Sequence, residues 1–389
     1  MQHPSGLLTI DLSAIQGNWL QLRQMLASGA ECGAVVKADG YGLGMAPVAR
    51  ALQKAGCRSF FVVTLSEGVA LRRALAAETA VDADIYLLRG VQLGAEHQCV
   101  AAGLIPVLIN YPMAQRWLAW CKTAQVPQAQ RRSAIKINTG MNRLGLEPDE
   151  LMTLAAVPGC LADLGCELLL SHLACADQAG HPLNNHQLTL FETLLTRCRQ
   201  ELPGVRASLA NSAATQQGER WHFDLVRPGI SLYGGNPTGL PRHQMRPVVR
   251  LQLPVVQSRV VQPGSAIGYG AAYVSDSERH LATIAGGYGD GLFRSMGNHG
   301  QVWFKQALPI VGRVSMDSFV VDVTDIPPAE RPVEGDTVEC LGPHWDIDAA
   351  AQAAGTISYE ILTRLTGRYE RCYLLDGYLQ DKQIVDMAL

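Results

Sequence analysis

Short apolar runs and longer amphipathic stretches alternate through the first 235 residues of the chain. The apolar runs are too short for helices, so each predicts a buried strand, and the stretches between them predict helices. Eight strands are expected, at residues 34–36, 60–64, 85–88, 106–109, 134–137, 167–170, 206–209 and 225–231, the last with a turn at Pro228 and Gly229. Eight strand-and-helix units in about 200 residues favour a (β/α)8 TIM barrel over a doubly wound sheet, which alternates in the same way.

The pattern changes after Tyr233, where a turn-rich connector at 234–241 leads into strands without helices between them. Strands are predicted at 248–256, 280–285, 301–305, 308–311, 318–323, 336–341 and 369–375, with one helical segment at 347–365. The predicted fold class is therefore α/β, a (β/α)8 barrel followed by a mainly β C-terminal domain.

The composition indicates a globular protein of two or three domains, with 48% hydrophobic residues, 17% charged residues and a net charge of -3 over 389 residues. No basic stripe favours nucleic acid, no apolar run is long enough for a membrane span, and the first six residues lack the features of a secretory signal. The ten cysteines are scattered without a Cys-x-x-Cys pair, which is typical of reduced thiols. We expect a cytoplasmic protein without nucleic-acid or membrane partners.

Three common motifs are incomplete or missing. The glycine-rich segment 40–44 does not complete Gly-x-Gly-x-x-Gly, because Met45 and Pro47 occupy the last position of the two frames, and no Gly-Lys dipeptide allows a P-loop. His181 and His186 are five residues apart and no His-Glu-x-x-His occurs, so no metal site is expected.

Polar residues at the strand ends are the candidates for chemistry, because a barrel carries its catalytic side chains at the C-terminal ends of its strands. The residues at these positions are Lys37, Thr64, Arg89, Asn110, Lys136, Asn138, Arg143, His172, Asn211, Ser212 and Arg227. Lys37 ends an apolar strand, where partial dehydration would lower the pKa of its amine and suit it to catalysis. The alternative is a lysine whose ammonium extends to solvent, and position alone does not decide between the two.

The segment AVVKADGYGLG at 34–44 resembles the pyridoxal-phosphate attachment motif of alanine racemases. The resemblance continues in the family's order from residue 9 onward, through NTGMNRLG at 138–145, SHLA at 171–174, ANSAA at 210–214, VRPGISLYG at 226–234, GYGAAY at 268–273, GYGDG at 287–291, GRVSMD at 312–317 and ISYE at 357–360. It implies a pyridoxal-phosphate (β/α)8 barrel followed by a β-rich domain, which agrees with the fold predicted from the pattern.

The resemblance implies two catalytic bases. Lys37 would hold the cofactor covalently and serve the D-enantiomer, and Tyr269 would serve the L-enantiomer from the opposite face. His172 and Arg227 would help Tyr269 to ionise. Arg227 would also face the pyridine nitrogen, which a guanidinium cannot readily protonate.

The remaining site residues follow from the same resemblance. Besides Lys37 and Arg227, it implies cofactor binding by Tyr41, His172, Asn211, Ser212, Tyr359 and the backbone amides of Gly229 and Ile230. It implies substrate binding by Arg143 and the backbone amide of Met316, with Tyr288 and Tyr359 narrowing the entrance. Lys136 matches a lysine that is carbamylated in many family members. Because Asn138 stands where aspartate is common, carbamate, chloride and a free ammonium all remain open.

The family organisation implies a head-to-tail homodimer in which Tyr269 and Met316 reach the other subunit's active site. We expect residues 1–12 to associate with the C-terminal domain, the barrel to span 13–236 and the C-terminal domain to span 237–389. The expected function is interconversion of L- and D-alanine, for peptidoglycan or for D-alanine catabolism. The alternatives are a broader racemase of small amino acids such as serine, a decarboxylase and a pyridoxal-phosphate carrier. A zinc-assisted dehydratase would need a His-x-Cys pair in the C-terminal domain, and the sequence has none there.

Overall fold

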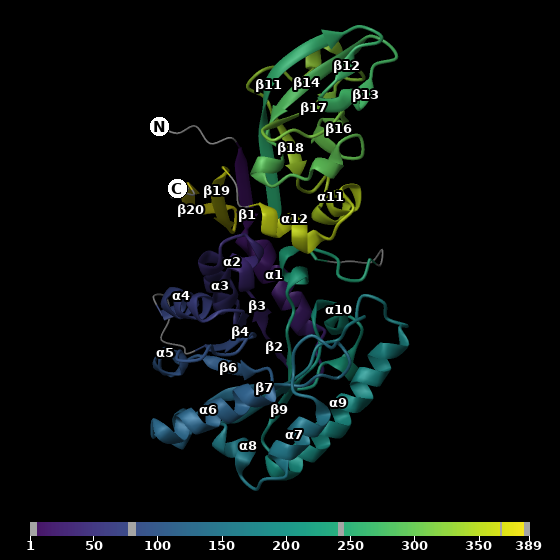
Figure 1. Cartoon of the computed structure of the whole chain (residues 1–389). Helices are drawn as coiled ribbons and strands as arrows, with labels where there is room; N and C mark the ends of the chain where they lie inside the picture. Colours follow the sequence, from purple (N-terminus) through teal and green to yellow (C-terminus); the bar gives the residue numbers. More distant parts are fainter. Residues whose placement is uncertain (1–5, 77–82, 240–244, 366–367, 385–389) are drawn as a thin grey trace.

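Parallel strands form a closed barrel in the first part of the chain, shown in the lower half of Figure 1. The computed structural model describes residues 6–76, 83–239, 245–365 and 368–384. Seven strands pair in parallel and in chain order: β3 (Ala34–Val35), β4 (Ser59–Val62), β5 (Asp84–Leu87), β6 (Ile105–Leu108), β7 (Ser133–Lys136), β8 (Cys166–Leu170) and β9 (Arg206–Ser208).

The barrel closes through its last strand, β10 (Leu225–Val226), which pairs in parallel with β2 (Glu31–Cys32), just before β3. On the other side, the amide of Asp224 donates to the carbonyl of Ala207 at 3.1 Å. With β2 and β3 counted as one strand interrupted at Gly33, the predicted eight-stranded (β/α)8 barrel is confirmed.

The last barrel strand is shorter than the predicted 225–231. It ends at Val226, because Pro228 has no N–H to donate to a ladder, and the chain then turns into the 3-10 helix η3 (Ile230–Tyr233). The turn carries Gly229 and Ile230 to the mouth of the barrel.

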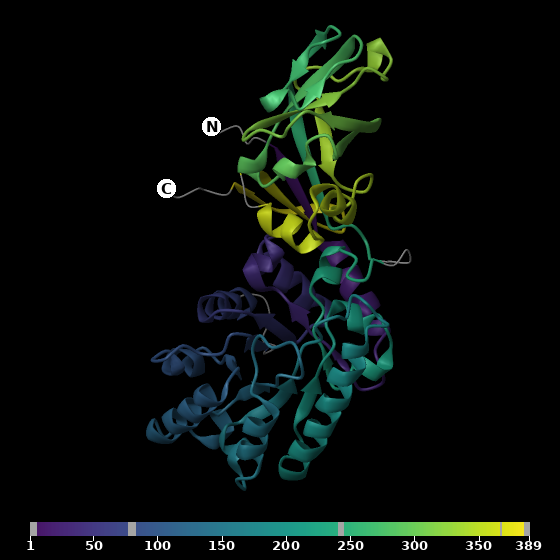
Figure 2. The same cartoon turned by 45° about the vertical axis from the view of Figure 1, so that its right-hand side comes forward.

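Helices surround the strands (Figures 1 and 2). They are α1 (Leu12–Gln24), α2 (Lys37–Tyr41), α3 (Met45–Ala55), α4 (Leu65–Ala76), α5 (Glu96–Ala101), α6 (Tyr111–Thr123), α7 (Pro148–Ala155), α8 (Cys160–Asp163), α9 (Pro182–Glu201) and α10 (Ser212–Thr215). Side-chain caps begin several of them: Asp11 accepts from the amide of Ala14 at α1, and Asn110 accepts from that of Met113 at α6, both at 2.8 Å. No helix of the described ranges is long and apolar enough to cross a bilayer.

The second part of the chain is a nine-stranded sheet. Its order is β14 (Arg279–Ala285), β17 (Ser318–Asp322), β16 (Gln306–Val311), β15 (Gln301–Phe304), β18 (Thr337–Leu341), β11 (Val249–Val261), β1 (Leu7–Asp11), β19 (Glu370–Leu375) and β20 (Tyr378–Ile384). An additional pairing of β14 with β11 closes six of these strands into a small barrel. The N-terminal strand β1 lies between β11 and β19, so residues 7–11 pair with the second part of the chain.

Some predicted elements differ from the structure. The helix predicted at 347–365 is two helices, α11 (Ile347–Ala354) and α12 (Ser358–Arg364), because Gly355 has a left-handed φ of 68° and ends the first. The hairpin of β12 (Ala266–Ile267) and β13 (Tyr273–Val274) and the edge strand β20 were not predicted. Residues 1–5 lie outside the described residues, and they make up most of the segment in which a secretory signal was sought. Residues 385–389 and the end of the predicted connector, 240–241, also lie outside them.

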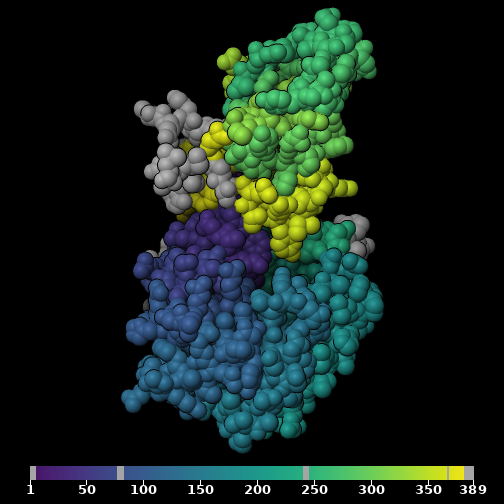
Figure 3. All heavy atoms as spheres, viewed as in Figure 1, coloured from purple at the N-terminus to yellow at the C-terminus, as the bar shows by residue number. Residues whose placement is uncertain are grey.

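Helix α12 packs against the first part of the chain, and Figure 3 shows yellow residues of the C-terminal part directly against the purple first units of the barrel. The contact is close: a Cβ on Gly42, just after α2, would stand 2.6 Å from the carbonyl oxygen of Leu362 in α12. This packing brings Tyr359 of α12 over the mouth of the barrel.

Candidate active site

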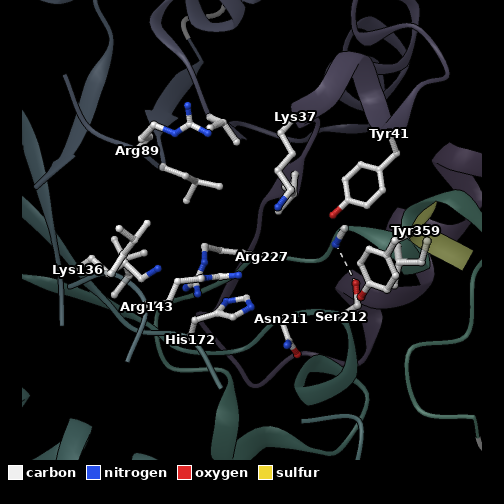
Figure 4. Close-up of a pocket in the computed structure, with 17 residues that line it drawn as sticks. Lys37, Tyr41, Arg89, Lys136, Arg143, His172, Asn211, Ser212, Arg227 and Tyr359 are labelled. Carbon is white, nitrogen blue, oxygen red and sulfur yellow. Dashed lines mark hydrogen bonds between the residues drawn. The ribbon is translucent and has the colours of Figure 1, made fainter. Parts of the chain in front are cut away.

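A cavity of about 320 Å³ lies at the C-terminal ends of the barrel strands (Figure 4). The predicted site residues that line it are Lys37, Tyr41, Lys136, Arg143, His172, Asn211, Ser212, Arg227, Gly229, Ile230 and Tyr359. Its other lining residues are Val35, Val63, Leu88, Arg89, Leu144 and Leu170. None of these 17 residues is acidic, so the wall of the cavity presents several cations and no carboxylate.

Lys37 and Tyr41 both point into the cavity from the segment that follows β3 (Figure 4). The four residues 38–41 all have left-handed φ values, between 52° and 64°. Three of them are not glycine, so this turn is costly and must be held by its surroundings. Burial lowers the pKa of Lys37, and the charge of Arg143 lowers it further, against an opposing effect of Glu67. At a given pH, a larger fraction of Lys37 is therefore deprotonated than of an exposed lysine.

Arg227 is buried at the floor of the cavity and held in one orientation. Its guanidinium donates to the Ser208 hydroxyl and, at 2.5 Å, to the carbonyl of Ser171. Burial lowers the pKa of Arg227 to about 10, which leaves it charged near neutral pH. Burial, then Arg227 and Lys136, lower the pKa of His172 well below its ordinary value, so its imidazole is neutral.

Figure 4 shows Tyr41, Ser212 and Tyr359 at the other end of the cavity. The backbone of Gly229 and Ile230 belongs to the same lining, with Gly229 bonded to Ser212, and we call these three hydroxyls and two amides the donor cluster. The amide of Gly229 donates to the Ser212 hydroxyl at 2.8 Å. Burial raises the pKa of Tyr359 to about 12 and that of Tyr41 further, so both are neutral hydrogen-bond donors. Neutral donors converging on one point are suited to an anion.

Three predicted strand-end residues have structural contacts. Asn211 lines the cavity and also caps α10, where its side chain accepts from the amide of Ala214 at 3.1 Å. Asn110 caps α6 and Thr64 bonds at the start of α4, and neither lines the cavity. Polar residues at strand ends thus serve helix capping as well as chemistry.

Lys136 ends β7 and is 8% exposed. Burial, followed by the charges of Arg227 and Arg143, lowers its pKa to about 8. Asn138 donates to Asn142 at 2.9 Å and to Glu147 at 2.8 Å, and thereby braces the loop that carries Arg143.

Arg89 is the polar lining residue to which no role was assigned. It follows β5 and was among the strand-end positions, so its place in the barrel could have identified it. The apolar members of the lining come from the same strand ends and the 138–147 loop, and they carried no separate signal.

The structure does not bring Tyr269, Tyr288 or Met316 into this cavity. All three lie in the β-rich part of the chain, where the residues are 72%, 43% and 54% exposed. The turns of Tyr288 and Met316 are joined by backbone hydrogen bonds: the Tyr288 amide donates to Ser315 at 3.1 Å and the Gly289 amide to Met316 at 2.9 Å. These two residues are therefore presented together on one surface.

Comparisons with known proteins cover both parts of the chain. Residues 10–237 match the family model described as alanine racemase, N-terminal domain, and residues 248–373 match that of the C-terminal domain. The chain is 45% identical over 371 residues to the alanine racemase of Rhodospirillum rubrum, covering 95% of this chain and 96% of that protein. It is 45% identical over 372 residues to the catabolic alanine racemase of Mesorhizobium japonicum, covering 95% and 93%.

Solved structures give the same result. The crystal structure of alanine racemase from Bartonella henselae, with covalently bound pyridoxal phosphate, superposes with a TM-score of 0.87 at 38% identity, covering 96% of this chain and all of that one. Alanine racemase from Streptomyces coelicolor superposes with a TM-score of 0.86 at 34% identity, covering 96% of this chain and 98% of that one. The chain belongs to the alanine racemase family.

Proposed function

We propose that this chain interconverts L- and D-alanine with pyridoxal phosphate bound in the barrel cavity. The observation that carries the proposal is the arrangement of that cavity, in which Lys37 stands between a neutral donor cluster at one end and the cations Lys136 and Arg143 at the other. The named relatives support the same activity.

The residues present fit this cofactor. Tyr41, Ser212, Tyr359 and the amides of Gly229 and Ile230 would hold its phosphate, and Arg227 would face its pyridine nitrogen. Gly229 fits this role because any side chain there would collide with Tyr41. When bound, the cofactor supplies an electron sink that makes the α-proton of an amino acid acidic enough to remove.

The residues of the chain supply the proton transfers and the orientation. Lys37, with its lowered pKa, would take or return the α-proton on one face of the substrate. Tyr269 of a second subunit would do so on the other face, and His172 would help that tyrosine to ionise. The fixed, charged Arg227 guanidinium holds its protons, so it would bind the ring nitrogen without protonating it.

Substrate recognition would combine a charge and a narrow entrance. Arg143 and the Met316 backbone amide would bind the substrate carboxylate, because a guanidinium suits bidentate contact. Tyr288 and Tyr359 would limit the size of the side chain. Alanine is the proposed substrate, and broader action on serine is the alternative. Either the supply of D-alanine for peptidoglycan or its catabolism is compatible with this chemistry.

We propose a head-to-tail homodimer, supported by the exposure of Tyr269, Tyr288 and Met316 away from the cavity of their own chain. The barrel would span 13–236 and the C-terminal domain 237–389. Residues 1–12 would associate with the C-terminal domain, as the pairing of β1 with β11 and β19 supports. The ten cysteines form no disulfide with one another, which supports a reducing, cytoplasmic location. Lys136 would be a carbamate, an ammonium beside a bound chloride, or a free ammonium.

The test is a panel of L-alanine, L-serine and L-lysine incubated with the purified, cofactor-loaded protein in deuterated water. Chiral chromatography and mass spectrometry would follow inversion and α-deuteration. We expect inversion with α-deuteration, fastest for alanine. Loss of CO₂ from any of the three, or no exchange at the α-carbon, would refute the proposal.

A further inference from the structure

Glu67 lies in the first turn of α4, outside the lining of the cavity, and the mechanism above does not use it. One of its carboxylate oxygens, Oε2, accepts from the amides of Val63 at 2.7 Å and Thr64 at 3.1 Å. The Thr64 hydroxyl accepts from the Glu67 amide in return at 3.2 Å. This reciprocal pair is a capping box, which the Thr-x-x-Glu sequence encodes. The capping box accounts for the hydrogen bonds of Oε2 but not for those of Oε1.

The second oxygen has a different partner. Oε1 of Glu67 accepts at 2.8 Å from the amide of Ala38, the residue that follows Lys37 in the turn just after the neighbouring strand β3. Ala38 has a φ of 52° and is the first residue of the left-handed turn that points Lys37 and Tyr41 into the cavity. A left-handed conformation is unfavourable for an alanine, so the turn needs contacts that select it.

A charged acceptor is suited to this task, because hydrogen bonds to a carboxylate are stronger than those between neutral groups. The bond fixes the peptide plane between Lys37 and Ala38 and thus the direction in which the Lys37 side chain leaves the backbone. A second carboxylate holds the far end of the turn, where Asp39 accepts from the amide of Met45 at 2.8 Å.

We propose that Glu67 is a positioning residue for Lys37, which uses one carboxylate oxygen to cap α4 and the other to hold the turn that aims the amine. The inference deepens the proposed function and rests on it for the role of Lys37. The charged groups that face Lys37 from the cavity wall are Arg89, Lys136, Arg143 and Arg227, all cations, with His172 neutral. Glu67 supplies the opposing negative charge and raises the pKa of Lys37.

Glu67→Gln separates the two roles. Glutamine completes a capping box as glutamate does, but it has a single acceptor oxygen. With that oxygen on Val63 and Thr64, its amide nitrogen faces the Ala38 N–H, so the anchor and the charge are both lost. Thr64→Ala is the matched control, because it weakens the cap and leaves the carboxylate in place.

Two measurements on the cofactor-loaded protein test the inference. Hydrogen exchange at the Ala38 amide should accelerate about 10-fold in Glu67→Gln, as expected for loss of one hydrogen bond, and should change little in Thr64→Ala. The kcat for D-alanine should fall about 10-fold in Glu67→Gln with a small change in KM, and the acidic limb of its pH profile should move to lower pH. Thr64→Ala should lower the melting temperature and leave the pH profile in place.

Equal effects of the two variants on exchange and pH profile would overturn the inference, because a purely structural role predicts that result. If Glu67→Gln does not fold, Glu67→Asp replaces it: the shorter carboxylate caps α4 but does not reach Ala38, so exchange there must still accelerate. A wild-type protein that inverts no amino acid would refute the proposed function, while the exchange measurement would still decide whether Glu67 holds the turn.

Discussion

The Tyr41 hydroxyl lies against the Cα of Gly229 so closely that a Cβ on residue 229 would stand 2.1 Å from the Tyr41 oxygen. The Tyr41 side chain cannot easily move away from residue 229, because it is buried and its ring stacks on Tyr233 with centroids 4.6 Å apart. A residue from the first barrel unit and one from the last therefore meet at the donor cluster, and glycine permits the contact.

Gly229→Ala should weaken cofactor binding at least about 10-fold, equivalent to about 1.4 kcal/mol, because the new methyl group displaces the Tyr41 hydroxyl. Titrating cofactor-free protein with pyridoxal phosphate and following absorbance would measure the dissociation constant. Gly204→Ala is the control, since a Cβ there meets nothing within 4 Å. Adding Tyr41→Phe to Gly229→Ala removes the hydroxyl that clashes with the new methyl group. The double variant should therefore regain part of the stability lost in Gly229→Ala, but not the affinity for pyridoxal phosphate. Unchanged affinity in Gly229→Ala would contradict the assignment of the donor cluster to the phosphate.

The lowered pKa of Lys136, from 10.5 to about 8, predicts a pH-dependent stability. Between these values the unfolded chain keeps a proton that the folded chain has released, so the free energy of unfolding rises with pH across this window, by up to about 3 kcal/mol. Below about pH 8 the folded protein bears the full cost of a buried ammonium. In CO₂-free, chloride-free buffer, the stability advantage of Lys136→Met over the wild type should therefore shrink from pH 7.5 to 9.5.

Urea unfolding at each pH measures this, with the exposed Lys54→Met as the control variant. Adding bicarbonate or chloride at constant ionic strength then distinguishes the three states of Lys136. Stabilisation of the wild type but not of Lys136→Met by bicarbonate indicates a carbamate, and the same result with chloride indicates an anion site. A pH dependence shared by wild type and Lys136→Met would show that Lys136 is not the titrating group.

Arg368 joins the turn of Tyr288 to the turn of Met316. Its Nε lies 3.0 Å from Asp290, which is buried and belongs to the same turn as Tyr288, and its guanidinium donates at 2.5 Å to Asp317, next to Met316. Arg368→Gln should raise KM for alanine about 3- to 10-fold, because both turns lose a shared brace, and should leave the cofactor affinity unchanged.

Steady-state kinetics in both directions would test this. Arg364→Gln is the comparison, because Arg364 makes an exposed pair with Glu360 at 3.2 Å that is expected to contribute little. If Arg364→Gln and Arg368→Gln change KM equally, the brace has no specific role in substrate binding.

The barrel could be predicted from sequence because its buried parallel strands are continuous apolar runs, such as Ile105–Leu108, and its helices are amphipathic. The last strand was predicted too long, because its apolar residues continue past Pro228 into a 3-10 helix that is buried as fully as a strand would be. The edge strand Tyr378–Ile384 is mostly polar and forms by pairing with β19. The local pattern of apolar residues does not indicate such a pairing.

The site residues that could be predicted from sequence are those that the barrel geometry brings together. Lys37, Lys136, His172 and Arg227 were found as strand ends, because the fold brings those positions together. Arg89 was found in the same way, but residue type alone did not give it a role. Tyr269 and Met316 lie on a surface of the second domain, and only the resemblance to alanine racemases connects them with the cavity.

The proposed active site combines Lys37 of one subunit with Tyr269 of another, and mixing two inactive variants tests this sharing most directly. Lys37→Ala and Tyr269→Phe should each lose activity, the latter about 10²- to 10⁴-fold. When the two are refolded together, half of the dimers are hybrids with one intact site each, so racemisation should return to about a quarter of the wild-type rate. Mixtures that form hybrid dimers and stay as inactive as the separate variants would contradict the shared site.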